Sequence, residues 1–290
     1  MVKYRVQLRA VANVAASKTA IIDVPCGQRF HYIVLQHGYA SGTNTIAAAA
    51  TNISEIRVLV NSRVQRVVSG TQLRDMNLLN GTQYDSVTGE VPNTSPGVSF
   101  GIFLAEPWRN SPADQDALAW ATAGWQTFQI QVDLGAASTP TLVAYAVVDD
   151  FVPAAGSTPG IVKWIRSSIT ASGTSMDIPT LDRRDWLQQI SLYEDSGGSN
   201  AATSVTFKRN SVTLHELSAA SNKALLTQYG MTPAASGRTA GIYDMVLDHD
   251  GLLGSAVPLD GARDTLLTIA AGGAMSGTIV AIIQRLGPPE

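Results

Sequence analysis

Short runs of alternating or β-branched apolar residues, separated by turn residues, constrain the fold of this chain more than any other feature. Runs such as Thr127–Leu134 and Thr141–Val148 alternate apolar and polar side chains with the two-residue period of a half-buried strand. Turn residues recur at short intervals between such runs, which is typical of a β-sandwich or a barrel. We therefore expect an all-β protein, with short helices in the connections at Thr71–Leu79, Asp114–Trp120 and Ser218–Gln228.

The composition indicates a sparsely charged surface, and the chain is long enough for two domains. Its 290 residues divide into two domains of ordinary size, each able to bury a core. Only 15% of the residues are charged, against a typical value of about 25%, which excludes a disordered charged chain and a coiled coil. The net charge of −3 provides no basic footprint for sequence-specific nucleic-acid binding. The single cysteine, Cys26, excludes an internal disulfide framework and a cysteine-based zinc cluster.

The two halves of the chain resemble each other at a spacing of 149 residues. Asn61 and Gly81 recur as Asn210 and Gly230, and each pair lies in the same order of strand, Asn-Ser turn, strand, helix and glycine. An uncharged segment of small residues and prolines at 151–159 reads as a linker between the halves. Two copies of one β-sandwich in tandem, at 1–150 and 160–290, account for this pattern.

One segment is long enough to cross a membrane. The twenty residues between Asp264 and Arg285 carry no charge, but three glycines, a serine and three threonines dilute them. The turn-like segment Ala271–Gly277 divides them into two short β-rich arms, so we expect a buried hairpin and not a tail anchor. The N-terminus lacks the apolar stretch of a signal peptide, which argues against secretion by that route.

The usual catalytic motifs are missing from the sequence. It contains no nucleophile elbow, no phosphate-binding loop and no dinucleotide-binding glycine pattern. The four histidines have spacings that fit neither a cupin nor a zincin metal site, so we expect isolated surface or half-buried histidines. We therefore predict that the protein is not an enzyme and requires no cofactor.

Two weaker patterns leave alternatives open. Asp248 and Asp250 alternate before Gly251 as in a calcium loop, although an ordinary turn between strands explains them as well, because Leu259 stands where an EF-hand needs its glutamate. Among the aromatic residues, a set of tryptophans could form a sugar-stacking platform, or it could pack in the core. That set consists of Trp108, Trp120 and Trp125. A two-sandwich carbohydrate-binding or carbohydrate-active protein is therefore the alternative function.

The N-terminus is basic on an otherwise acidic chain. Lys3, Arg5, Arg9 and Lys18 all precede the first acidic residue, Asp23. They are either the solvated face of a first strand or an arm that contacts an anionic partner, such as lipid head groups.

Several packing and turn segments follow one another in a distinctive order over both halves of the chain. They are Asn13-Val14-Ala15-Ala16, Pro25-x-Gly27-Gln28, the strand and turn Ile56–Asn61, and Leu226-Thr227-Gln228-Tyr229-Gly230. In this order the chain resembles a known family, the double jelly-roll major capsid proteins of tailless icosahedral bacteriophages with an internal membrane, of the corticovirus type.

The resemblance implies two tandem jelly rolls per chain and a structural role in the virion shell, after synthesis in the host cytoplasm. It implies a homotrimer of pseudo-hexameric outline that tiles an icosahedral shell over an internal membrane. The implied partners are other copies of the chain in its own and neighbouring capsomers, other capsid proteins such as the vertex protein, and anionic lipid at the basic arm. Members of the family also bind calcium at subunit contacts, which favours calcium at Asp248 and Asp250.

Overall fold

The structure is a computed structural model that divides into two compact units. The first unit is Met1–Ile161 together with Pro289–Glu290, and the second is Val162–Pro288. The residues that the structure describes are 2–40, 45–82, 86–87, 97–151, 160–178, 181–194 and 201–290. Except for Phe151, the linker expected at 151–159 therefore lies outside the described residues.

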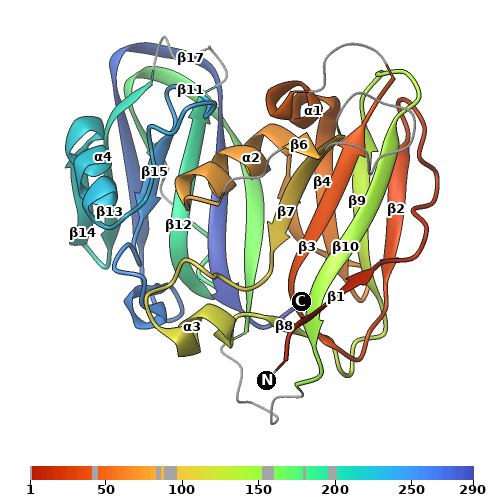
Figure 1. Ribbon diagram of the computed structural model, residues 1–290. Coiled ribbons are helices and arrows are strands. Elements are labelled where there is room, and N and C mark those ends of the chain that lie inside the picture. Colours follow the sequence, from red (N-terminus) through yellow and green to blue (C-terminus); the bar gives the residue numbers. More distant parts are fainter. Residues whose placement is uncertain are drawn as a thin grey trace. The chain divides into compact units, whose positions relative to one another are not determined.

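The first unit contains two antiparallel sheets (Figure 1). One sheet has the order β1 (Tyr4–Gln7), β10 (Thr141–Asp149), β3 (Arg29–Gly38), β7 (Gly97–Phe103) and β6 (Ser86–Val87), with β8 (Trp120–Ala121) paired to β3. The other runs β5 (Arg63–Val68), β4 (Ile53–Val60), β9 (Phe128–Leu134) and β2 (Thr19–Val24). Alternate residues of β9 are buried, as the apolar pattern of that segment predicted. The core therefore lies on the inner faces of these strands.

The second unit is built around one long strand. β17 (Thr265–Gly287) pairs with β13 (Ala202–Arg209) through its first part and with β12 (Trp186–Glu194) through its last part (Figure 1). β13 also pairs with β14 (Val212–Ser218), and β17 neighbours β11 (Ile161–Ile178). β15 (Tyr243–Val246) and β16 (Val257–Pro258) pair with β12.

The continuity of β17 corrects the expectation of a hairpin between Asp264 and Arg285. The glycine-rich centre of the segment is mostly exposed but stays within the strand, and Gly277 adopts a φ of 91° there, which only glycine tolerates well. The glycines therefore let a single strand pass from one pairing partner to another. No helix among the described residues has the length and apolar character needed to cross a membrane.

Four α-helices and one 3₁₀ turn lie between the strands of the described chain. They are α1 (Ile46–Asn52), α2 (Gly70–Leu79), α3 (Pro112–Ala117), α4 (Ala219–Gln228) and the turn η1 (Leu253–Ser255). The expected helices at Thr71–Leu79 and Ser218–Gln228 are confirmed to within one residue. The expected helix at Asp114–Trp120 begins earlier and stops at Ala117, because Trp120 joins β8.

The 149-residue repeat corresponds to a repeat of local structure. β4, β5 and α2 of the first unit correspond to β13, β14 and α4 of the second at this spacing, apart from one residue at the end of β14. The turns between the paired strands have positive φ at both central residues, with 50° and 65° in the first and 50° and 62° in the second. Asn61 and Asn210 occupy the first of these positions, and each accepts two backbone hydrogen bonds.

Candidate functional site

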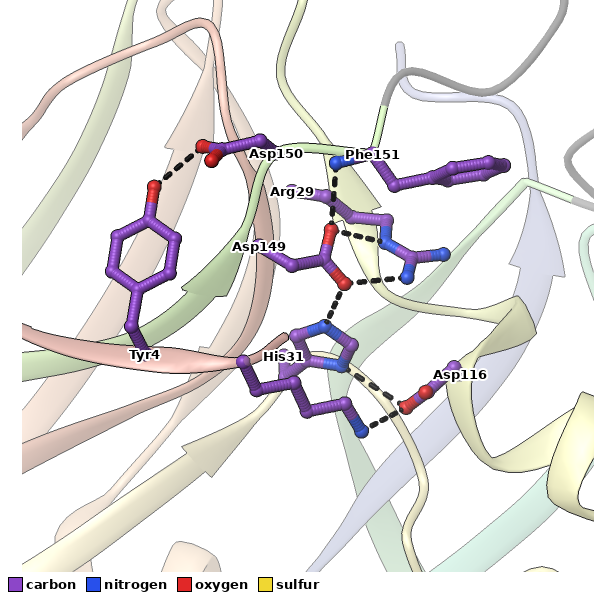
Figure 2. Close-up of polar contacts among 8 residues, drawn as sticks. Tyr4, Arg29, His31, Asp116, Asp149, Asp150 and Phe151 are labelled. Carbon is purple, nitrogen blue, oxygen red and sulfur yellow. Dashed lines mark hydrogen bonds and ion pairs between the residues drawn. The ribbon is translucent and has the colours of Figure 1, made fainter. Parts of the chain in front are cut away.

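An ion network lies at one end of the first unit, where β1 and β3 begin and β10 ends (Figure 2). β3 and β10 are antiparallel, and their register places Arg29 opposite Asp149. His31 follows Arg29 by two residues on β3, so both side chains are on the same face of the strand. The sheet register therefore directs a guanidinium and an imidazole toward one carboxylate.

Asp149 is the centre of this network and is completely buried. Its Oδ1 accepts hydrogen bonds from Arg29 Nε at 3.0 Å and from the Phe151 backbone N–H at 2.9 Å. Its Oδ2 accepts from Arg29 Nη2 at 2.6 Å and lies 2.8 Å from His31 Nε2. Burial alone would raise the pKa of Asp149, but the hydrogen bonds from Arg29 and His31 outweigh it and lower the pKa to about 2. The carboxylate is therefore ionised near neutral pH.

His31 connects this carboxylate to the N-terminal segment (Figure 2). Its Nδ1 lies 3.1 Å from Asp116 Oδ1 on α3, and the same oxygen accepts a 2.6 Å hydrogen bond from Lys3 Nζ. Burial lowers the pKa of His31, whereas its hydrogen bond to Asp149 raises it. Lys3 links the N-terminal segment to α3 through the same Asp116 oxygen that His31 approaches.

This network has the residues of an Asp-His pair but no nucleophile. Its hydrogen-bonding side chains are carboxylates, a guanidinium, an imidazole, an ammonium and the Tyr4 phenol, which donates to Asp150 Oδ1 at 2.5 Å. Acyl transfer by a histidine base needs a serine, threonine or cysteine within its reach. The arrangement instead fastens the N-terminal segment and α3 to the ends of β3 and β10.

The predicted basic arm forms the edge strand β1 and the segments that flank it. β1 pairs only with β10 among the described strands, and all four predicted cations are exposed. Lys3 is bound to Asp116, as described above. Arg5, Arg9 and Lys18 form no ion pair with any residue in the described ranges. Three of the four predicted arm residues are therefore available to an external anion.

The predicted calcium residues lie in one turn after β15. The Asp248 carbonyl accepts from the Gly251 N–H at 2.9 Å, while Asp250 accepts from the Leu252 N–H at 3.0 Å and from Ser255 Oγ at 2.5 Å. The described part of the chain contains no group of three or more histidine, cysteine, aspartate or glutamate side chains arranged to hold a metal ion. Because calcium takes six to eight oxygen ligands, the turn would need ligands from elsewhere, and calcium binding stays a prediction.

The tryptophans do not form an exposed platform. Trp120 is completely buried, packs edge-on against Trp125 with ring centroids 5.7 Å apart, and lies beneath the Arg66 guanidinium at 4.9 Å. Phe128 contacts both rings. Trp108 packs edge-on against Phe103 with ring centroids 5.4 Å apart, and both Trp108 and Trp125 are half-buried. The carbohydrate alternative therefore loses the support of an exposed tryptophan platform.

The expectation of isolated surface or half-buried histidines is wrong for two of the four. His31 is 2% exposed and His37 is 0% exposed, and both are hydrogen-bonded. The network around Asp149 was also missed. The side-chain contacts of His31 and Asp149 join residues that are 85, 118 and 120 positions apart in the chain. The available signal was the spacing Arg29-x-His31 at the start of one strand and Asp149-Asp150 at the end of another.

Comparison with known proteins identifies the family. The model of the viral coat protein P2 N-terminal domain matches residues 5–149, which is half of the chain. No curated protein sequence matches significantly. The matched segment contains most of the first unit, including β3, β10 and the network between them.

Solved structures share the whole fold. The major capsid protein P2 of bacteriophage PM2 is 20% identical, with a TM-score of 0.77, and the match covers 99% of this chain and 98% of that one. The STIV major capsid protein is 13% identical with a TM-score of 0.69, covering 99% and 97%, and the PBCV-1 capsid is 12% identical with a TM-score of 0.63, covering 98% and 93%. These similarities confirm the double jelly-roll fold. With the family match, they show that the chain belongs to the viral coat protein P2 family and is a structural protein of the virion shell, not an enzyme.

Proposed function

We propose that this coat protein is the major capsid subunit of its virus and assembles as a homotrimer. The observation that carries the proposal is the repeat of one strand-turn-strand-helix unit in both halves of the chain. Because each chain contributes two similar sandwiches, three chains provide six similar lobes, and such a pseudo-hexagonal unit tiles a flat facet of an icosahedron. The PM2 and STIV proteins with the same fold are themselves major capsid proteins, which supports the assignment.

The low charge content supports extensive lateral contacts between subunits. Surfaces rich in serine, threonine and alanine lose little favourable hydration when they are covered, whereas unpaired charges would lose much. Upright sandwiches also cover one another's strand edges, which protects those edges from uncontrolled pairing. The partners in this proposal are copies of the chain in the same and neighbouring capsomers, and other capsid proteins such as a vertex protein.

The basic arm supports the second part of the proposal, which is that the inner face of the trimer contacts an internal membrane. Anionic head groups attract each exposed lysine or arginine near the surface by roughly 1 kcal/mol, screened within about 8–10 Å at physiological salt. Arg5, Arg9 and Lys18 carry this attraction, while Lys3 contributes less because Asp116 neutralises it. Many trimers bound side by side would convert weak attraction per subunit into strong binding.

One experiment tests both parts on the full-length protein. Native mass spectrometry at micromolar concentration should give three times the chain mass of 30.6 kDa. In such a trimer we expect each subunit interface to bury more than the roughly 1,600 Å² of a standard complex. The variant Arg5→Gln/Arg9→Gln/Lys18→Gln should keep this mass. It should bind phosphatidylserine-containing vesicles at low salt up to about a hundredfold more weakly than the wild type.

A matched control distinguishes vesicle binding through the basic arm from a general effect of the net charge of the protein. Arg63→Gln/Lys223→Gln/Arg263→Gln removes three exposed cations elsewhere on the surface and should retain most of the vesicle binding. A monodisperse monomer would contradict the assembly proposal. Equal vesicle binding by the two triple variants would contradict the arm assignment and leave the trimer unaffected.

A further inference from the structure

The second unit contains a cavity of about 230 Å³ that the function in the shell does not explain. Its wall is mostly aliphatic, with Ile165 and Ile169 from β11, Ile190 from β12 and Ile283 from β17. These side chains belong to the hydrophobic core of the unit or pack against it. The volume exceeds the roughly 150 Å³ of an apolar protein cavity that admits benzene and falls below the ~300–1,000 Å³ of sites for drug-sized ligands. A small ligand with an apolar body fits it.

One charged side chain from β17 also lines this cavity. Ala281, Ile283 and Arg285 alternate along the strand and all line the wall, so the arginine occupies a position where the pattern of the strand calls for an apolar residue. The Arg285 side chain is only 3% exposed. Its Nη1 forms an ion pair with Asp182 Oδ2 at 3.0 Å, while its Nε has no hydrogen-bond partner in the described ranges. A buried guanidinium with an unused N–H group requires an explanation.

Asp182 does not provide a full counter-charge for this arginine. Its side chain is 38% exposed at the cavity wall, and Arg184 donates to both of its oxygens at 2.8–3.2 Å. Arg184 is thus the main partner of Asp182, and it lies on the solvent side with 66% of its side chain exposed. The three residues together carry one excess positive charge. An anion in the cavity would balance this charge and use the free N–H group.

We propose that the cavity binds a small amphiphilic carboxylate. Its unbranched apolar tail occupies the aliphatic space between β11, β12 and β17, and its carboxylate accepts hydrogen bonds from the Arg285 guanidinium. Because such a ligand binds only the folded sandwich, it stabilises the second unit by RT ln(1 + [L]/Kd), an amount that rises with the free ligand concentration. The proposal concerns one unit of a single chain and is independent of trimer formation and of the membrane.

The test uses octanoate and its neutral analogue octanol, titrated calorimetrically into the purified full-length protein. Octanoate should bind with a stoichiometry of one per chain and should raise the thermal unfolding midpoint. Octanol should bind at least tenfold more weakly. In Arg285→Met, which keeps an apolar side chain of similar length, octanoate should lose at least tenfold in affinity while octanol changes little.

Two neighbouring serines provide a steric control that does not depend on the arginine variant. Ser167 lines the cavity, whereas Ser168 follows it on the opposite, exposed face of β11. Ser167→Phe should abolish the binding of both compounds, and Ser168→Phe should leave both unchanged. The proposal is overturned if the wild type shows no saturable octanoate binding, or if the two phenylalanine variants bind octanoate equally.

Discussion

At the scale of single residues, Asp149 is a buried charge that holds together one end of the first unit. Its charge is fully buried, and both of its oxygens are hydrogen-bonded, so the network has the satisfied geometry that makes a buried ion pair tolerable. Arg29 also stacks on Phe151, with its guanidinium carbon 4.5 Å from the ring centroid. Removal of one partner would leave the others buried without compensation.

We therefore predict that Asp149→Asn destabilises the protein by about 3–5 kcal/mol, because it leaves the Arg29 guanidinium buried without a counter-charge. The adjacent Asp150 provides the matched control, since it is exposed and accepts a hydrogen bond from the Tyr4 phenol. Asp150→Asn should cost at most about 1 kcal/mol. Urea unfolding of the two variants at pH 7 checks the difference. Equal costs would show that the buried network is not the stabilising centre.

The histidines show what could and could not be predicted from the sequence for single residues. The sequence placed His31 on a strand, where its type and position were compatible with either exposure or burial. What buries it is the pairing of β3 with β10 and the approach of α3, and these contacts join residues about 85 and 118 positions away. A local sequence pattern gives no information about which distant segments pair. The network therefore could not be predicted from the sequence, whereas the strands that hold it could.

At the scale of elements, the repeated helices provide a matched pair. α2 and α4 have ten residues each, and their N-caps, Ser69 and Ser218, both accept a hydrogen bond from the backbone N–H three residues later at 3.1 Å. Ser69 has a second bond, because its own N–H donates to Gln72 Oε1 at 2.8 Å and completes a capping box. The position corresponding to Gln72 in α4 is Ser221, whose side chain is too short to do the same.

We predict that Ser69→Ala costs about 1–2 kcal/mol of local stability and that Ser218→Ala costs about 0.5–1 kcal/mol. The first variant disrupts a capping box with two reciprocal hydrogen bonds, whereas the second loses a single N-cap hydrogen bond. Hydrogen exchange of the amides in each helix measures the two losses separately. Ser69→Asp, which retains a capping oxygen, should restore most of the protection in α2. A larger loss in α4 than in α2 would contradict this ranking.

Element boundaries were predictable where the sequence contains a start and stop signal. α2 and α4 each follow a serine and end before a glycine with positive φ, and both were located to within one residue. α1 was missed because its run of alanines has no amphipathic period. β17 was divided in error because a glycine-rich bend within a strand and a glycine-rich turn look the same in one sequence.

At the scale of the whole molecule, the fold was predictable because its signals are distributed and redundant. Alternating strands, turn residues and the internal repeat all indicate two sandwiches, so errors in single elements do not change the architecture. The prediction of function rested on fewer observations. Composition and missing motifs excluded classes of protein, and the order of packing segments indicated the capsid family that the comparisons then confirmed. The cavity and its buried arginine had no sequence signal, because an arginine near the end of a strand is usually exposed.

Stability as a function of pH is a property of both units together. His31 and His37 lie in the first unit and His215 in the second, and burial lowers the pKa of all three, that of His215 to about 4. In the unfolded chain a histidine titrates near pH 6.5. Between the unfolded and the folded pKa, the unfolded chain therefore binds more protons, and acidification favours it. The stabilising contribution of these groups is fully present above about pH 6.5 and decreases as the pH falls toward 4.

We predict that the urea midpoint is constant from pH 8 to 7 and declines steadily from about pH 6.5 to 4. Asp149 extends the decline below pH 4, since its stabilisation is lost as the pH approaches its folded pKa of about 2. His215→Gln should flatten part of the decline between pH 6.5 and 4, because glutamine can still donate to the Tyr243 hydroxyl, which lies 2.9 Å from His215 Nε2, but cannot take up a proton. A wild-type midpoint independent of pH between 7 and 4.5 would show that burial does not set the protonation of these histidines. An unchanged slope in His215→Gln would assign the decline to the other groups.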